Sequence, residues 1–196
     1  MNQEEFRREL IQKDPLEFVQ TYITSDNPSP HIGSYELRVI EEYMRSKFVL
    51  REGESISAIV VGSAKLGFAF LEKHTKNGSY KPAYRKYEPG ESDIDVAIIS
   101  PHIYEKIWRE LARFKKFYSD KNDLKNYMYR GWINPFKLPN PGPQICIDWR
   151  DVCRAFNKMP NFKHKKLRFA LYHEKYFLDI YQQKGIETAR NQEQMI

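Results

Sequence analysis

The run Ser92-Asp93-Ile94-Asp95-Val96-Ala97-Ile98-Ile99 restricts what this chain can fold into more than any other segment. Successive side chains of a β-strand point to opposite faces, so a strand here places Asp93 and Asp95 together and turns Ile94, Val96 and Ile98 toward a core. Two like charges on one face repel each other unless a cation lies between them. A divalent ion with oxygen ligands meets that need. The run therefore predicts a core strand with a metal-binding face.

A second apolar run lies upstream, from Ile56 to Val61, and it ends in Gly62-Ser63. Residues 64–71 can begin a helix after this turn, and free N–H groups at the start of a helix bind phosphate. Glycine at the turn lets phosphate approach the backbone closely. We predict that Gly62 and Ser63 bind the phosphates of a nucleotide, while Ser63 can also cap the helix. Lys65 is either a further phosphate contact or a solvated lysine.

A third carboxylate would complete a site for phosphoryl transfer with two metal ions, which lie about 3.5–4 Å apart in such sites. The segment Gln144 to Trp149 alternates in polarity and predicts a short strand that ends near Asp148. Asp151 lies about one helical turn further on and is the alternative. We predict Asp93, Asp95 and Asp148 as the catalytic metal ligands, with Mg²⁺ or Mn²⁺ as the cofactor.

The order of these motifs resembles the nucleotidyltransferase superfamily of the DNA polymerase β type, in particular its compact stand-alone bacterial members. In that family a strand, Gly-Ser, a helix and a strand with Asp-x-Asp precede a third carboxylate on a later strand. The matching residues are Gly62, Ser63, Asp93 and Asp95, with Asp148 as the candidate third acid. The resemblance covers about 33–148. It departs from the compact members at 74–91, an apparent insertion.

The resemblance implies an α/β (α+β) fold in which a small, mixed, twisted sheet packs on helices. We predict a single nucleotidyltransferase domain over residues 1–196, with a core at about 33–150 and helical flanks at 1–32 and 151–196. Within the second flank, the segment from about Asn161 to Gln183 is predicted to be helical, because Leu167, Leu171, Leu178 and Tyr181 fall on one side.

The chain has 32 Lys and Arg against 26 Asp and Glu, and the net charge of +6 suits an anionic partner such as nucleotide or nucleic acid. Basic residues alternate with tyrosines between Lys73 and Tyr87, which predicts either nucleic-acid binding or a mobile loop. Tyr127, Arg130 and Trp132 are candidates for a base-stacking face or a phosphate clamp, or else for core packing.

Two cysteines do not make a disulfide framework, and no run approaches the roughly 18 apolar residues of a membrane-spanning helix. The charged segment Met1 to Asp14 has no apolar stretch typical of a signal peptide. We therefore expect a cytoplasmic protein without a membrane partner.

The predicted activity is transfer of a nucleoside monophosphate from an NTP (ATP included) or a dNTP to a hydroxyl, with release of pyrophosphate. Three acceptors compete: a nucleotide or oligonucleotide in template-independent synthesis or nucleotide-signal synthesis, a tRNA end, and a protein hydroxyl. The basic, tyrosine-rich segment 73–87 favours the first of these. The resemblance implies a setting in antiviral defence or a toxin–antitoxin system, with a partner protein from the same operon. A hypothesis of a different class is an inactive adaptor that keeps the fold and binds nucleic acid or a partner protein.

Overall fold

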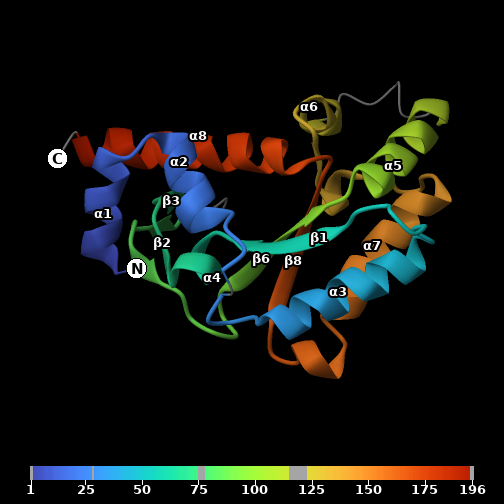
Figure 1. Cartoon of the computed structure of the whole chain (residues 1–196), viewed down its shortest axis with the longest axis horizontal. Coiled ribbons are helices and arrows are strands. Elements are labelled where there is room, and N and C mark those ends of the chain that lie inside the picture. Colours follow the sequence, from blue (N-terminus) through green and yellow to red (C-terminus); the bar gives the residue numbers. More distant parts are fainter. Residues whose placement is uncertain (1, 28, 75–77, 115–122, 195–196) are drawn as a thin grey trace.

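The computed structural model of the chain describes residues 2–27, 29–74, 78–114 and 123–194. A four-stranded sheet with the order β1-β6-β8-β7 crosses its middle (Figure 1). β1 (Ser57–Val61) runs antiparallel to β6 (Asp93–Ile99), β6 runs parallel to β8 (Lys166–Tyr172), and β7 (Trp132–Ile133) runs antiparallel to β8. The predicted small mixed sheet packed with helices is therefore confirmed.

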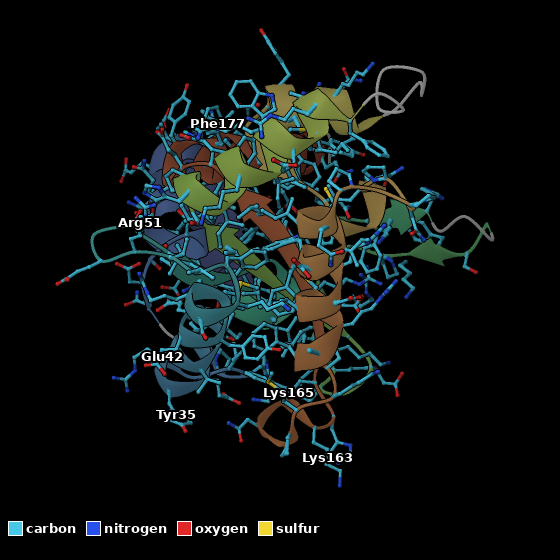
Figure 2. All side chains as sticks on the ribbon, turned by 90° about the vertical axis from the view of Figure 1, so that its right-hand side faces the viewer. Tyr35, Glu42, Arg51, Lys163, Lys165 and Phe177 are labelled. Carbon is cyan, nitrogen blue, oxygen red and sulfur yellow. The ribbon has the colours of Figure 1, made fainter. Side chains whose placement is uncertain are left out.

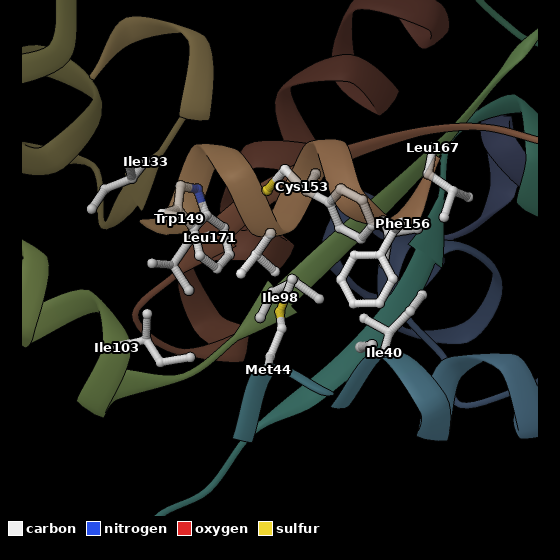
Figure 3. Packing of buried hydrophobic residues seen from close by; sticks show 14 of the residues in the cluster. Ile40, Met44, Ile98, Ile103, Ile133, Trp149, Cys153, Phe156, Leu167 and Leu171 are labelled. Atoms are coloured by element: carbon white, nitrogen blue, oxygen red, sulfur yellow. The ribbon is translucent and has the colours of Figure 1, made fainter. Parts of the chain in front are cut away.

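One face of the sheet packs against α3 (Ser34–Lys47), α5 (Pro101–Arg113) and α7 (Gln144–Phe156). Ile94, Val96 and Ile98 of β6 are all buried in the same apolar cluster as the inward residues of these helices. Figure 3 shows Met44 of α3 and Trp149 of α7 beside Ile98. The alternation of β6 thus sends its aliphatic side chains to this face.

The opposite face is covered by α8 (Lys175–Gln194) together with the N-terminal elements α1 (Gln3–Gln12), α2 (Pro15–Phe18) and the π-helical turn η1 (Val19–Ile23). Figure 1 shows both chain ends on the same side of the molecule, where α1 meets the end of α8.

Polar contacts fix α8 to the N-terminal elements. Arg190 Nε donates to the Leu10 carbonyl at 2.8 Å. Asp179 is buried, and its Oδ1 accepts from Thr24 Oγ1 at 2.6 Å and from Lys175 Nζ at 3.2 Å. Because an unpaired buried charge is costly, these partners hold the first part of α8 at a fixed place over the sheet.

The structure corrects the helix predicted over residues 161–183. Residues 166–172 form the strand β8, which is hydrogen-bonded between β6 and β7, and the helix begins only at Lys175. Leu167, Phe169 and Leu171 alternate along β8 and join the cluster of Ile98. The sheet therefore extends past the core boundary predicted near residue 150.

The strand predicted from Gln144 to Trp149 is also wrong, because these residues form the first half of α7. The buried side chains of α7 recur every three or four residues, at Cys146, Trp149, Val152, Cys153 and Phe156. That period is typical of a helix with one buried face, and the short window up to Trp149 is compatible with either period.

The helix predicted after Gly62-Ser63 is short. α4 spans Ser63–Leu66 and ends at Gly67, whose φ of 84° is the left-handed conformation that closes many helices. The chain from Phe68 through most of the apparent insertion then forms two small two-stranded sheets, from β2 (Phe68–Ala69) with β5 (Arg85–Lys86) and from β3 (Lys73–His74) with β4 (Tyr80–Lys81). Residues 75–77 lie outside the described residues.

Two of the three tyrosines in the basic segment 73–87 serve packing. Tyr84 contacts the ring of Phe6 and donates from its hydroxyl to Glu193 of α8 at 2.6 Å. Burial raises the pKa of Tyr84 to about 12. Tyr87 is buried, so only Tyr80 is exposed in the way that stacking on nucleic acid requires.

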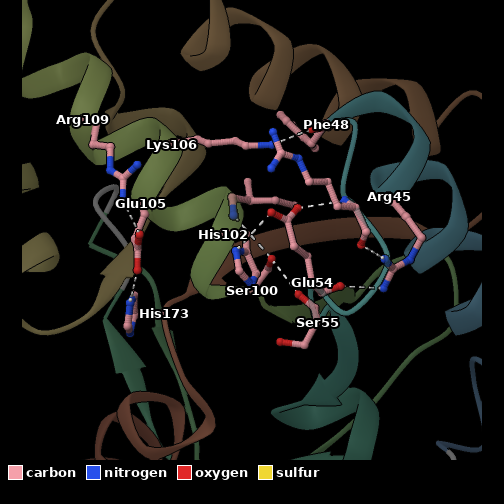
Figure 4. A network of polar contacts seen from close by, with 12 residues as sticks. Arg45, Phe48, Glu54, Ser55, Ser100, His102, Glu105, Lys106, Arg109 and His173 are labelled. Atoms are coloured by element: carbon pink, nitrogen blue, oxygen red, sulfur yellow. Dashed lines mark hydrogen bonds and ion pairs between the residues drawn. The ribbon is translucent and has the colours of Figure 1, made fainter.

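A polar network joins the start of β1 to α5 (Figure 4). Ser100 caps α5 by accepting from the Ile103 N–H at 3.4 Å and donates to the Ser55 carbonyl at 3.0 Å. Glu54 Oε1 lies 3.5 Å from His102 Nδ1. The network fixes the far end of β6 against the residues that lead into β1.

The turn before β8 is held against α3. Lys165 forms an ion pair with Glu36 of α3, while Lys163 points away from the body of the molecule (Figure 2). The solvent side of α3 carries the exposed residues Tyr35 and Glu42. In the described part of the chain no helix is long and apolar enough to cross a membrane.

Gly131 and Gly53 make a matched pair for testing how β7 is held beside α8. Both have positive φ, 72° and 85°, which costs a residue with a Cβ about 1 kcal/mol or more. A Cβ at Gly131 would clash with the ring of Phe177 in α8, whereas a Cβ at Gly53 meets nothing within 4 Å. We expect Gly53→Ala to lower the free energy of unfolding by about 1 kcal/mol and Gly131→Ala by about 3 kcal/mol or more. Urea unfolding measures both, and equal losses would contradict the predicted clash with Phe177.

Candidate functional site

The glycine–serine turn and the paired carboxylates meet at one end of the sheet. In the antiparallel ladder Val61 is opposite Asp95, and Gly62 follows at once. Gly62 has φ 69° and ψ −148°, a conformation essentially restricted to glycine. A Cβ on Gly62 would lie 3.3 Å from Asp95 Oδ2. The backbone of the turn therefore lies directly against the carboxylate.

A pocket of about 870 Å³ opens between this face of the sheet and α8. Asp95 and Gly62 lie at its wall, and its cationic lining consists of Lys73, Arg130, Arg168 and Lys184. Its aromatic lining includes Phe70, Phe136, Trp132, Tyr172 and Tyr181. Of the predicted clamp residues, Arg130 and Trp132 line the pocket, and Tyr127 packs on Trp132 with 4.3 Å between ring centroids.

The charge of Asp95 is destabilised by its surroundings. Burial raises the pKa of Asp95 to about 6, with Arg168 opposing the shift and Asp93 adding to it. Asp95 remains exposed to solvent in the pocket, so the neighbouring protein removes only part of the hydration of its ionised carboxylate. A bound cation would relieve this cost.

Arg168 is the partner of the second carboxylate. Its Nη2 lies 2.9 Å from Asp93 Oδ2, and its Cα is paired with that of Asp95 in the parallel ladder. Leu167 and Phe169 turn to the other face of the sheet, so Arg168 shares the face of Asp93 and Asp95. The sequence prediction missed Arg168 because it made this segment helical.

The structure does not bring Asp148 to the site, which corrects its prediction as the third metal ligand. α7 packs on the face of Ile94 and Val96, whereas Asp95 belongs to the opposite face. Asp148 Oδ1 lies 3.8 Å from Lys47 Nζ of α3. Within the described residues no three acidic, histidine or cysteine side chains are placed to hold one metal ion.

The alternative third acid fails for the same reason. Asp151 also lies on α7, where it pairs with Arg154 at 3.5 Å.

Lys65 is not directed at the pocket. Its Nζ donates to the Ser25 carbonyl at 2.8 Å and to the Asn27 carbonyl, and burial lowers its pKa. Lys65 therefore fastens the loop before α3 to α4, which corrects the prediction of a phosphate contact. Ser63 is the first residue of α4 and follows Gly62 at the pocket wall, while the N–H groups of Lys65 and Leu66 donate to the Gly62 carbonyl at 3.1 and 3.3 Å.

An aromatic wall stands beside the carboxylates. The ring centroid of Trp132 lies 5.0 Å from that of Tyr181 and 6.1 Å from that of Tyr172. Burial raises the pKa of both tyrosines, and the negative charge of Asp95 raises both further. Tyr181, on α8, was another pocket residue that the sequence prediction did not assign to the site.

The residues present fit one Mg²⁺ or Mn²⁺ ion. Mg²⁺ is usually bound by one or two carboxylates, with phosphate oxygens and water as its other ligands, and Asp93 and Asp95 supply that number. The observation that favours a cation here is the placement of both carboxylates on one face of β6, with Asp95 close to the Gly62 turn. A pair of ions held by three carboxylates does not fit the described residues.

No protein-family model, curated protein or solved structure matches this chain.

The raised pKa of Asp95 predicts how Asp95→Asn changes stability with pH. Without metal, ionised Asp95 costs stability as the pH rises from its unfolded value near 3.8 through about 6, and the full cost applies above pH 6. A shift of this size corresponds to about 3 kcal/mol, which we reduce to about 1 kcal/mol because solvent reaches the carboxylate. In a chelating buffer, urea unfolding should show Asp95→Asn more stable than the wild type at pH 7.5 and equal to it near pH 4.

Asp148→Asn is the control for removal of a carboxylate. Asp148 lies outside the pocket, and we expect this variant to be no more stable than the wild type at pH 7.5, since it loses the contact with Lys47 at 3.8 Å. A stability difference between Asp95→Asn and the wild type that does not change with pH would contradict the assigned environment of Asp95.

Proposed function

We propose that this protein is a metal-dependent nucleotidyltransferase with a fold of the DNA polymerase β type. It would transfer a nucleoside monophosphate from an NTP or dNTP to a hydroxyl acceptor and release pyrophosphate. The observation that carries the proposal is the position of the Gly62 turn close to Asp95, so close that a Cβ on Gly62 would lie 3.3 Å from its carboxylate, at the wall of a cationic and aromatic pocket. A phosphate-binding turn beside paired carboxylates suits a triphosphate with its metal ion.

The lining of the pocket supports a nucleotide in one orientation. The triphosphate would lie near Gly62 and Ser63, with Arg130, Lys73 and Lys184 supplying positive charge around it. The nucleobase would contact Tyr181, which is 45% exposed within the aromatic wall, since the face of a tyrosine stacks with any base. The pocket volume of about 870 Å³ exceeds the lower range for small-molecule sites and leaves room for an acceptor group.

The reaction forms a bond from the acceptor hydroxyl oxygen to the α-phosphorus. The bond from the α-phosphorus to the bridging oxygen breaks, pyrophosphate leaves with the electron pair, and the hydroxyl proton passes to water. When bound, Mg²⁺ or Mn²⁺ would neutralise phosphate charge. Asp93 and Asp95 would hold the ion, and the turn at Gly62 would orient the phosphates so that attack occurs in line.

The acceptor is the open part of the proposal. Because Tyr87 is buried and Tyr84 is partly buried and bonded to Glu193, the segment 73–87 gives less support to oligonucleotide synthesis than its sequence suggests. Modification of a tRNA end or of a protein hydroxyl, in a toxin–antitoxin or antiviral setting with a partner protein of the same operon, is therefore an equal candidate.

A second candidate function is an adaptor that binds nucleotide or nucleic acid without turnover. The ion pair between Arg168 and Asp93 favours it, because a cation of the protein already meets one of the two carboxylates.

A transfer assay with matched variants tests the proposal. The wild type, Asp95→Asn and Asp148→Asn are incubated with each labelled NTP and dNTP plus Mg²⁺ or Mn²⁺, and pyrophosphate release is measured. Loss of a metal-binding carboxylate should lower the rate at least about 100-fold, since the charge of the transferring phosphate is no longer neutralised. Asp148→Asn, altered on the other side of the sheet, should stay within about twofold of the wild type.

A denaturing gel of the products separates labelled oligonucleotide, tRNA and protein. Turnover by Asp95→Asn equal to the wild type would contradict the proposed site. Nucleotide binding by the wild type with no turnover on any acceptor would instead support the adaptor.

A further inference from the structure

We propose that Arg168 takes the position of a third carboxylate, so that the site binds a single divalent ion and the guanidinium supplies the second positive charge of the reaction. This inference rests on the proposed function and deepens it. It makes Arg168 a catalytic residue that contacts the α-phosphate of the nucleotide.

The first support is position. β8 is the strand hydrogen-bonded to β6 at the carboxylates, and its register places Arg168 directly beside Asp95. Both residues line the same pocket. An acidic side chain at this place would join Asp93 and Asp95 in one cluster, and the chain has a guanidinium there instead.

The second support is the geometry of the guanidinium. Arg168 is held by Asp93 at 2.9 Å through one terminal nitrogen, and 57% of its side chain remains exposed. A guanidinium has five N–H donors in a planar fork that suits phosphate oxygens. Arg168 can therefore keep its contact with Asp93 and still bind a phosphate in the pocket.

The third support is charge balance. Two carboxylates, one guanidinium and one Mg²⁺ together carry one net positive charge, which is also the charge of three carboxylates with two Mg²⁺. A second ion added to the pair of carboxylates and Arg168 would leave three net positive charges with too few oxygen ligands. The described residues thus suit one ion and one guanidinium.

Counting bound metal tests this inference without relying on activity. Mn²⁺ is titrated into the protein with an α,β-methylene NTP analogue, which transfer cannot cleave, and bound ions are counted by electron paramagnetic resonance. We expect one Mn²⁺ per chain for the wild type and for Arg168→Gln, and two for Arg168→Asp, which restores a third carboxylate. Two ions bound to the wild type, or one bound to Arg168→Asp, would overturn the inference.

The same variants are then assayed for transfer. Arg168→Gln should lose at least about 100-fold in rate while it keeps its one ion, and Arg168→Lys should recover part of the loss. Lys166→Ala is the matched control, because Lys166 lies on the same strand and face but its charge meets the exposed Glu91 at 3.9 Å and lies outside the pocket. If Arg168→Gln and Lys166→Ala transfer at equal rates, the proposed catalytic role of Arg168 is wrong, and its contact with Asp93 is an ordinary surface ion pair.

Circular dichroism and thermal melting show whether each variant is folded, and the Lys and Gln variants keep the test valid if Arg168→Asp does not fold. Failure of the proposed function is distinguishable from failure of the inference. If neither the wild type nor any variant transfers a nucleotide, but the ion counts are one and two as expected, the proposed activity is wrong and the single-ion assignment stands.

Discussion

The parallel pairing of β6 with β8 is the contact on which the rest of the structure depends. It joins residues 93–99 to residues 166–172 at the centre of the sheet, across a long separation in sequence. Its aliphatic side chains form the layer under α3 and α7, and its polar side chains form the floor of the pocket. The same register that closes the core therefore decides which charged groups meet at the site.

The strand of the carboxylates could be predicted because its pattern fits only one structure. Asp93 and Asp95 alternate with Ile94 and Val96, and a helix would scatter these four residues around its circumference. The turn at Gly62 was predictable for a related reason, since an apolar strand that ends in glycine and serine is typically followed by a tight turn. That these two elements face each other follows from their antiparallel pairing.

The prediction of Asp148 as the third acid is wrong because a segment of a few residues does not distinguish the period of a helix from that of a strand. Leu167 and Leu171 are four residues apart, which suits a helix face and a strand face equally, and Phe169 between them decides for the strand. The segment up to Trp149 is similarly ambiguous until Phe156 is included. Because residues 144–149 are helical and residues 166–172 form a strand, Asp148 lies on the far side of the sheet and Arg168 lies beside the carboxylates. The position of a strand in the sheet is decided by its long-range pairing, which no local sequence pattern contains.

The position of α8, which forms one side of the pocket, depends on N-terminal residues that do not line the pocket. α8 contributes Tyr181 and Lys184 to the cavity, yet its position depends on Thr24 near its start and on Leu10 near its end. The first two dozen residues thus fix the position of α8 relative to the sheet. Substitutions in this N-terminal segment can change the distance between α8 and the sheet, and with it the size of the acceptor that the pocket admits, while every group that would contact the nucleotide stays the same.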